Sequence, residues 1–95
     1  EATASNVFWL KGNQVYTTPL SSGCVNGVMR KVIIQITNAI EQDISIEQLA
    51  DADEIFLTNT GSGIRPVKKM QGKVYETSYG VQLTNRLNDF IILSR

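Results

Sequence analysis

Residues 26–30 read Asn-Gly-Val-Met-Arg, and here a glycine-containing turn leads directly into an apolar helical repeat. From Val28 to about Ile40, the apolar residues recur at the spacing of one helix face, which predicts a helix. The first N–H groups of a helix have no partner within it, and they lie at the positive end of its dipole. This turn therefore predicts a site for an anion such as a phosphate group.

Short strands flank the predicted helix on both sides. Residues 7–10 and 15–18 are rich in β-formers, and a Gly-Asn pair within residues 11–14 is typical of a hairpin turn between them. Residues 54–58 lack the alternation of polar and apolar side chains that a half-exposed strand shows. They are predicted to form a strand that is buried on both faces.

The other predicted elements complete one small domain of mixed α and β structure. A turn of small residues, 59–63, follows the buried strand. We further expect a short strand at Ile44 and a helix over 45–52 opened by a capping box. A strand over 64–70 contains Pro66, which favours a sheet edge or a bulge. A return strand over 73–75 and a final helix with an apolar stripe from 79 to 91 are the last predicted elements.

Composition excludes several classes of function. Lys plus Arg equals Asp plus Glu at 9 each, so nothing points to nucleic acid or to an anionic membrane surface. The chain has no His, which excludes His-based catalytic triads and His-ligated zinc, and no metal site is expected. No apolar run approaches the ~20 residues of a membrane span. The single Cys24 excludes an internal disulfide and fits a cytoplasmic location.

Three segments in this order resemble the cofactor-binding half of the fold type IV pyridoxal-phosphate enzymes, the class IV aminotransferases. They are residues 1–9, 23–30 and 52–67, and a less specific match covers 72–74 with the terminal helix. The resemblance implies that residues 1–95 are the C-terminal cofactor-binding domain of such an enzyme. Its expected fold is α/β, like that of the D-amino-acid aminotransferases, with β-strands and two longer helices.

The resemblance also implies a role for the first segment. Glu1 stands where the family places the carboxylate that bonds the pyridine nitrogen of pyridoxal 5′-phosphate. A carboxylate there keeps that nitrogen protonated, so that the ring can draw electrons from the α-carbon of the substrate. Asn6 follows at the spacing seen in the family and is expected to fix this arrangement.

The two glycine-containing turns match the segments with which the family binds the cofactor phosphate. At the first turn, Gly27 precedes Val28 and Met29, whose main-chain N–H groups are the expected donors. Many members carry Thr at the position of Met29, and its hydroxyl adds a bond to the phosphate. At the second turn, the Thr60 hydroxyl and N–H are expected on the phosphate, and Asn59 and Gly61 are expected to face the cofactor and the substrate carboxylate.

Within the family, residues 6–13 and 25–30 are most similar to the lyases that release pyruvate and 4-aminobenzoate from aminodeoxychorismate on the route to folate. The alternative is a transaminase of branched-chain or D-amino acids. The substrate is then a small amino acid or aminodeoxychorismate, and a homodimer is expected. A third possibility, from another class, is a non-catalytic module that uses this scaffold for binding or assembly.

The chain is expected to be a fragment that is inactive alone. It begins with Glu1 rather than Met, and the Schiff-base Lys of the family lies upstream of the Glu that matches this residue. The lysines that are present fall in predicted turns, on the helix and on a strand, and none is expected in the apolar pocket that a catalytic lysine needs. The small domain that closes the active site is also expected to lie upstream.

Overall fold

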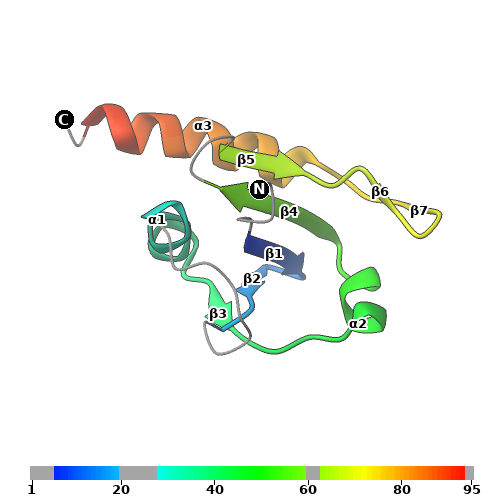
Figure 1. Ribbon diagram of the computed structural model, residues 1–95. Coiled ribbons are helices and arrows are strands. Elements are labelled where there is room, and N and C mark those ends of the chain that lie inside the picture. The colour runs from blue at the N-terminus through cyan, green and yellow to red at the C-terminus, as the bar shows by residue number, and fades with distance from the viewer. Residues whose placement is uncertain (1–5, 20–27, 60–62, 94–95) are drawn as a thin grey trace.

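The computed structural model describes residues 6–19, 28–59 and 63–93, with the side chains of 28, 59 and 90–93 left aside. Within these residues, five strands form one sheet in the order β3-β2-β1-β4-β5 (Figure 1). All neighbours are antiparallel except β2 and β3, which are parallel. The sheet strands are β1 (Asn6–Lys11), β2 (Gln14–Thr17), β3 (Ile40–Glu41), β4 (Glu54–Asn59) and β5 (Gly63–Pro66).

The predicted hairpin and the predicted buried strand are confirmed. β1 and β2 pair through a turn in which Gly12 adopts φ +62°, a conformation that costs glycine little. β1 lies between β2 and β4, and Phe8 of β1 stacks on Phe56 of β4 with ring centroids 5.3 Å apart. Both neighbours run antiparallel to β1, so the start of β1 lies beside the ends of β2 and β4. This edge of the sheet is formed by strand ends and not by an outer strand.

The helix predicted over residues 28–40 is α1 (Val28–Thr37), which ends three residues earlier. Asn38 takes a left-handed conformation, φ +56°, and the N–H of Ala39 bonds back to the carbonyl oxygen of Ile34 at 3.3 Å. This is the Schellman arrangement, with Asn in the place where Gly is more common. The chain then leaves the helix in extended form, so Ile40 lies in β3 instead of on the helix face.

The strands predicted at Ile44 and over 64–70 differ from those in the structure. The short strand predicted at Ile44 is absent, and the strand of this region is β3, which pairs in parallel with β2. Residues 64–70 were expected as one strand, but they form the end of β5 and then β6 (Lys69–Met70). β6 pairs with β7 (Lys73–Val74) in a separate hairpin, because the N–H of Val67 turns back to the carbonyl oxygen of Ile55. The edge position expected from Pro66 is confirmed, since β5 is an outer strand.

The two remaining helices are confirmed. α2 (Ile46–Ala50) opens with the predicted capping box, in which Ser45 and Gln48 each accept a hydrogen bond from the backbone N–H of the other. α3 (Ser78–Leu93) is the expected terminal helix, and with α1 it makes the two longer helices that were predicted. Among the described helices, none has both the length and the hydropathy of a membrane span.

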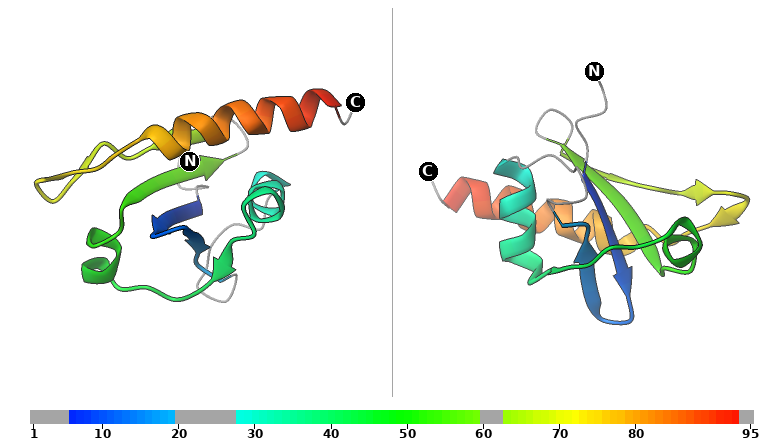
Figure 2. Two further views of the ribbon diagram at one scale, coloured as in Figure 1. Left: turned by 180° about the vertical axis from the view of Figure 1, so that it is seen from behind. Right: turned by 60° about the horizontal axis from the view of Figure 1, so that its bottom comes forward.

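The two faces of the sheet carry separate clusters of buried side chains, and Figure 2 shows the helices that lie against the sheet. α1 and α3 cover one face, where Ile33 and Leu83 pack with Phe8 and Phe56. α2 and the β6–β7 hairpin pack near the other face, whose buried residues are Trp9, Ala52, Ile55 and Tyr75. Even-numbered residues of β1, Asn6 among them, therefore point to the helix-covered face, and odd-numbered ones point away from it.

Candidate cofactor site

The first turn of α1 lies at the sheet edge where β1 begins and β4 ends. Arg30, in this turn, donates from Nη2 to the carbonyl oxygen of Thr18, directly after β2, at 3.0 Å. Met29 packs against the cluster that contains Phe56. The backbone N–H groups of Val28 and Met29 are the first two of the helix, so they have no partner within it. The first turn of α1 thus brings these two helix N-terminal N–H groups to this edge.

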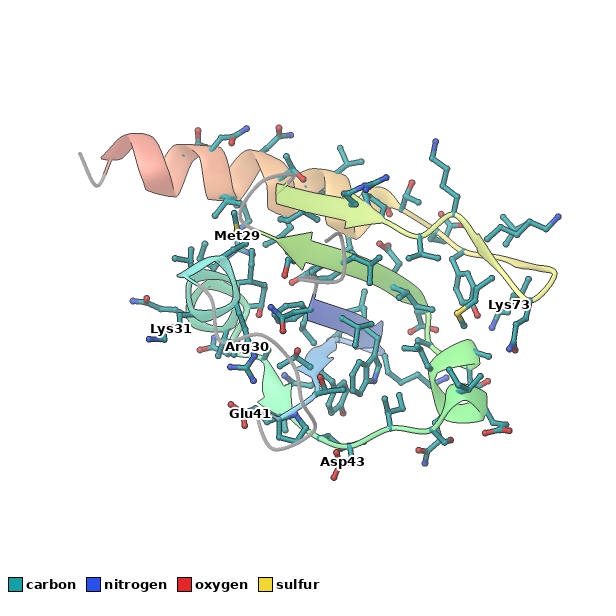
Figure 3. All side chains as sticks on the ribbon, viewed as in Figure 1. Met29, Arg30, Lys31, Glu41, Asp43 and Lys73 are labelled. Atoms are coloured by element: carbon teal, nitrogen blue, oxygen red, sulfur yellow. The ribbon has the colours of Figure 1, made fainter. Side chains whose placement is uncertain are left out.

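Arg30 anchors this turn to the sheet. Its side chain is only 3% exposed, and Nη2 also lies 3.3 Å from Oε2 of Glu41 in β3. Figure 3 shows Arg30 directed towards Glu41, whereas Lys31 points away from the sheet. The Nη2 of the guanidinium group thus joins α1 to β2 and β3, whereas its buried Nε has no hydrogen-bond partner among the described residues.

Asn6 and Thr58 lie directly opposite each other on β1 and β4, at the same edge. Asn6 is 4% exposed and Thr58 is fully buried. Neither the Oδ1 of Asn6 nor the Oγ1 of Thr58 has a hydrogen-bond partner among the described residues. Buried polar atoms are nearly always paired in native proteins, so these two oxygens, together with the Nε of Arg30, make this edge a candidate functional site.

The second predicted turn begins at the same edge. Asn59 ends β4 and pairs in register with Gly63, which opens β5 with φ +73°. Of the predicted site residues, the structure brings together here Asn6, Met29, and the backbones of Val28 and Asn59. Four others lie outside the described residues: Glu1, Gly27, Thr60 and Gly61.

Thr58 was not predicted as a site residue. The available signal was its position two residues after Phe56, which puts a hydroxyl on the helix-covered face of a strand expected to be buried on both sides. A polar side chain at such a position needs a partner. The sequence alone does not show that this partner is missing.

All five lysines of the chain are exposed, as expected for side chains that do not form a catalytic centre. The Nζ of Lys11 donates to the carbonyl oxygen of Asp51 at 2.9 Å. Lys73 donates to the carbonyl oxygen of Ala50 at 2.9 Å and lies over the ring of Tyr75, 5.1 Å from its centroid. These lysines hold turns and helix ends in place.

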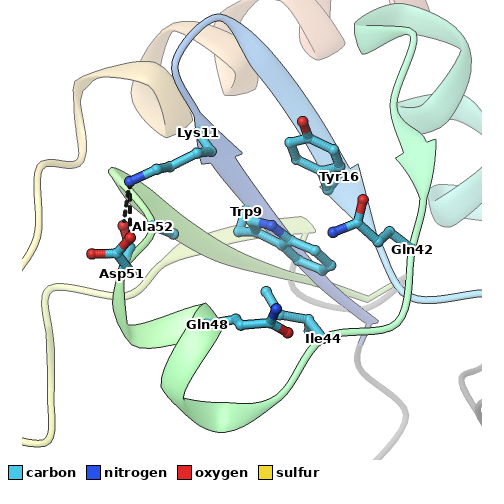
Figure 4. Close-up of a pocket in the computed structure, with 8 residues that line it drawn as sticks. All are labelled: Trp9, Lys11, Tyr16, Gln42, Ile44, Gln48, Asp51 and Ala52. Atoms are coloured by element: carbon cyan, nitrogen blue, oxygen red, sulfur yellow. Dashed lines mark hydrogen bonds and ion pairs between the residues drawn. The ribbon is translucent and has the colours of Figure 1, made fainter.

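A cavity of about 210 Å³ lies on the opposite face of the sheet (Figure 4). Trp9 and Tyr16 stack in its wall with ring centroids 5.6 Å apart. At its rim, the Nζ of Lys11 lies 3.1 Å from Oδ2 of Asp51, so these two charges satisfy each other. Of the predicted site residues that the structure describes, none lines this cavity, and it is separate from the edge that holds Asn6 and Thr58.

Comparison with known proteins assigns the chain to a family. The family model for amino-transferase class IV matches residues 1–70. The chain belongs to the class IV aminotransferases. This family uses pyridoxal phosphate, and an aminotransferase from Brucella abortus bound to this cofactor has the same fold. Its TM-score is 0.75 at 26% identity, with 88% of this chain and 33% of that protein covered.

Class IV relatives of this chain differ in activity. Branched-chain-amino-acid aminotransferase 1 of Arabidopsis thaliana is 34% identical over 86 residues, which is 85% of this chain and 22% of the relative. Aminodeoxychorismate lyase of Bacillus subtilis is 37% identical over 87 residues, which is 86% of this chain and 28% of the relative. The chain thus spans between about a fifth and a third of the relatives that it matches.

The residues at the described edge fit a phosphate-bearing cofactor of this kind. The first N–H groups of α1 can receive phosphate oxygens. The unpaired oxygens of Asn6 and Thr58 lie beside them, buried and without described partners. The family and the fold make this edge the candidate cofactor site of the chain.

Proposed function

We propose that this chain is the C-terminal cofactor-binding domain of a class IV enzyme, and that the whole protein is an aminodeoxychorismate lyase of folate biosynthesis. The products are then 4-aminobenzoate and pyruvate. The observation that carries the cofactor assignment is the meeting of the α1 N-terminus with the unpaired Asn6 and Thr58 at one edge. The lyase assignment is supported by the 37% identity to the Bacillus subtilis enzyme and by the sequence run from 25 to 30.

Each site residue has a defined task in this proposal. When bound, pyridoxal phosphate supplies an electron-poor ring that stabilises negative charge at the α-carbon of the substrate. Glu1 holds the proton on the ring nitrogen, and its own negative charge is what keeps that proton in place. The N–H groups of Val28 and Met29 bind the phosphate, following the loop that contains Gly27.

The second turn completes the contacts. Thr60 binds the phosphate through its hydroxyl and N–H, while Asn59 and Gly61 orient the cofactor and the substrate carboxylate. Asn6 fixes the edge from the start of β1. A lysine outside this chain moves the α-proton, because each lysine within it is exposed. The chain alone is thus expected to bind and orient, and to be catalytically inactive.

A transaminase is the second candidate, because branched-chain and D-alanine aminotransferases, at 34% and 33% identity, match the chain at least as significantly as the lyase does. The discriminating experiment uses the full-length protein with pyridoxal phosphate and aminodeoxychorismate, and follows pyruvate without any keto-acid acceptor. Sustained pyruvate release supports the lyase. A keto acid formed from leucine or D-alanine only when 2-oxoglutarate is present instead identifies a transaminase.

We also propose that the full-length protein forms a homodimer. A cytoplasmic homodimer is consistent with the single cysteine and the balanced charge. Light scattering of the full-length protein during size-exclusion chromatography tests the dimer. A non-catalytic module on the same scaffold is the alternative from another class. If the full-length protein binds no pyridoxal phosphate, that alternative replaces the enzyme.

A further inference from the structure

Thr58 differs from the other buried or half-buried threonines whose hydroxyl contacts are known. Thr17 is also fully buried, and its hydroxyl donates to the carbonyl oxygen of Val7 at 2.8 Å. The hydroxyls of Thr37 and Thr84 donate to carbonyl oxygens one helical turn earlier, at 2.7 and 2.9 Å. Thr58 has no such bond with any described residue. Its hydroxyl is therefore a buried hydrogen-bond donor that has no acceptor among the described residues.

The atom best suited to receive this donor lies directly across the sheet. Asn6 is the register partner of Thr58, and side chains at such positions have Cβ atoms about 4.5–5.5 Å apart. Its Oδ1 is an acceptor that also lacks a described partner. A hydroxyl donor and an amide acceptor thus face each other, both buried, without being bonded. A change of side-chain rotamer is enough to join them.

The position of the pair connects it with the cofactor site. Asn6 opens β1 at the edge where α1 begins, and Thr58 lies one residue before the end of β4. The amide of Asn6 has two hydrogens on Nδ2 as well as Oδ1, so fixing Oδ1 also fixes the direction of these hydrogens. An acceptor on a phosphate-bearing ligand at this edge can then use them.

We propose that Thr58 is a positioning residue for the cofactor site. When pyridoxal phosphate is bound, the Thr58 hydroxyl donates a hydrogen bond to Oδ1 of Asn6 and so directs the Nδ2 hydrogens of Asn6 towards the ligand. This inference rests on the proposed cofactor-binding role of Asn6. In the structure the two side chains are not bonded to each other.

The first measurement compares valine variants of two buried threonines in the full-length protein without cofactor. Thr17→Val removes a hydroxyl that is bonded, so the Tm of the full-length protein is expected to fall by about 2–4 °C. Thr58→Val removes one that is not, so the Tm is expected to stay unchanged or to rise. A fall equal to that of Thr17→Val overturns the proposal, because the Thr58 hydroxyl then already has a partner.

The second measurement is the affinity for pyridoxal phosphate, followed by the absorbance of the bound cofactor. Thr58→Val is expected to weaken binding about fivefold, the effect of one hydrogen bond, while Thr58→Ser restores it. Thr17→Val is the matched control and leaves the affinity of the folded protein unchanged. Because Thr58 acts through Asn6, Thr58→Val is expected to have no further effect in an Asn6→Ala background.

The outcomes separate this inference from the function on which it rests. Weaker binding by Asn6→Ala with normal binding by Thr58→Val leaves the site assignment intact and overturns the role of Thr58. Normal binding by Asn6→Ala overturns both, since Thr58 then has no residue through which to act. Additive losses in the double variant also contradict the proposal, because they show that Thr58 acts independently of Asn6.

Discussion

The carboxylate of Glu54 accepts a hydrogen bond from the backbone N–H of Gly80 at 3.3 Å, which joins the start of β4 to the first turn of α3. The same carboxylate accepts the N–H of Tyr79 at 3.0 Å and the hydroxyl of Ser78 at 3.3 Å. A buried negative charge thus satisfies the free donors of a helix N-terminus and opposes the positive end of its dipole. This contact holds α3 on the sheet.

Replacing Glu54 by Ala is expected to lower the free energy of unfolding by about 2 kcal/mol, because three donors lose their acceptor. Glu54→Gln keeps one acceptor oxygen and is expected to cost about half as much. Urea unfolding measures both. Glu76→Gln, at an exposed position just before α3, is the control and is expected to cost only a few tenths of a kcal/mol, on the order of a solvent-screened charge near a helix N-terminus. Equal stability of Glu54→Ala and wild type contradicts this role.

Arg30 and Glu41 form an unequal pair, because Arg30 is 3% exposed and Glu41 is 49% exposed. Arg30→Ala is expected to lower stability by about 3 kcal/mol, through loss of the bond to Thr18 and of buried packing. Glu41→Gln is expected to cost about 1 kcal/mol or less, since half-exposed ion pairs contribute little. Thermal unfolding of the two variants at matched ionic strength measures both losses of stability. Similar losses in the two variants reject this ranking.

Tyr79 makes stability depend on alkaline pH. Burial raises the pKa of its hydroxyl above the ordinary 10.0, an effect that the Arg86 charge reduces and the Glu54 charge increases. The folded state therefore keeps this proton when the unfolded state begins to lose it, so stability falls as the pH rises above about 10. Urea unfolding at pH 9 and 11 tests this. Tyr79→Phe is expected to lose less stability over that interval than wild type, and an equal loss refutes the assignment.

Met29 offers a test of the phosphate site. Met29→Thr places a hydroxyl in the first turn of α1, where many family members carry one, and is expected to tighten pyridoxal-phosphate binding several-fold, on the order of one hydrogen bond. It also removes apolar packing against the Phe56 cluster, so the Tm is expected to fall. Met29→Leu separates the two effects, because it keeps the packing and adds no donor. Unchanged affinity of Met29→Thr argues against a phosphate at this turn.

Elements with a strong local pattern could be predicted, and those decided by distant contacts could not. The capping box of Ser45 and Gln48 is local, so α2 was found with its start. The end of α1 depends on a left-handed Asn38, which apolar spacing does not reveal. The break between β5 and β6 depends on a bond from Val67 to Ile55, twelve residues earlier in the sequence.

The candidate site shows the same division. The sequence motifs predicted a helix start at Val28 and a site residue at Asn6. In the structure Val28 begins α1 and Asn6 begins β1. The importance of Thr58 could not be predicted, because it depends on a missing hydrogen bond in the folded chain. Glu54 was likewise predicted only as part of a strand, since its partners lie 24 to 26 residues away.

Trp9 is the only tryptophan of the chain, and it is buried against Tyr16 on the sheet face that points away from Asn6. The stacked pair can pass excitation from the phenol to the indole, so the emission of this chain reports the packing of α2 and the β6–β7 hairpin. The cofactor edge contributes no tryptophan to that signal. Because pyridoxal phosphate absorbs where tryptophan emits, a cofactor bound at that edge is expected to quench Trp9, so one fluorophore reports folding before the cofactor is added and cofactor loading afterwards.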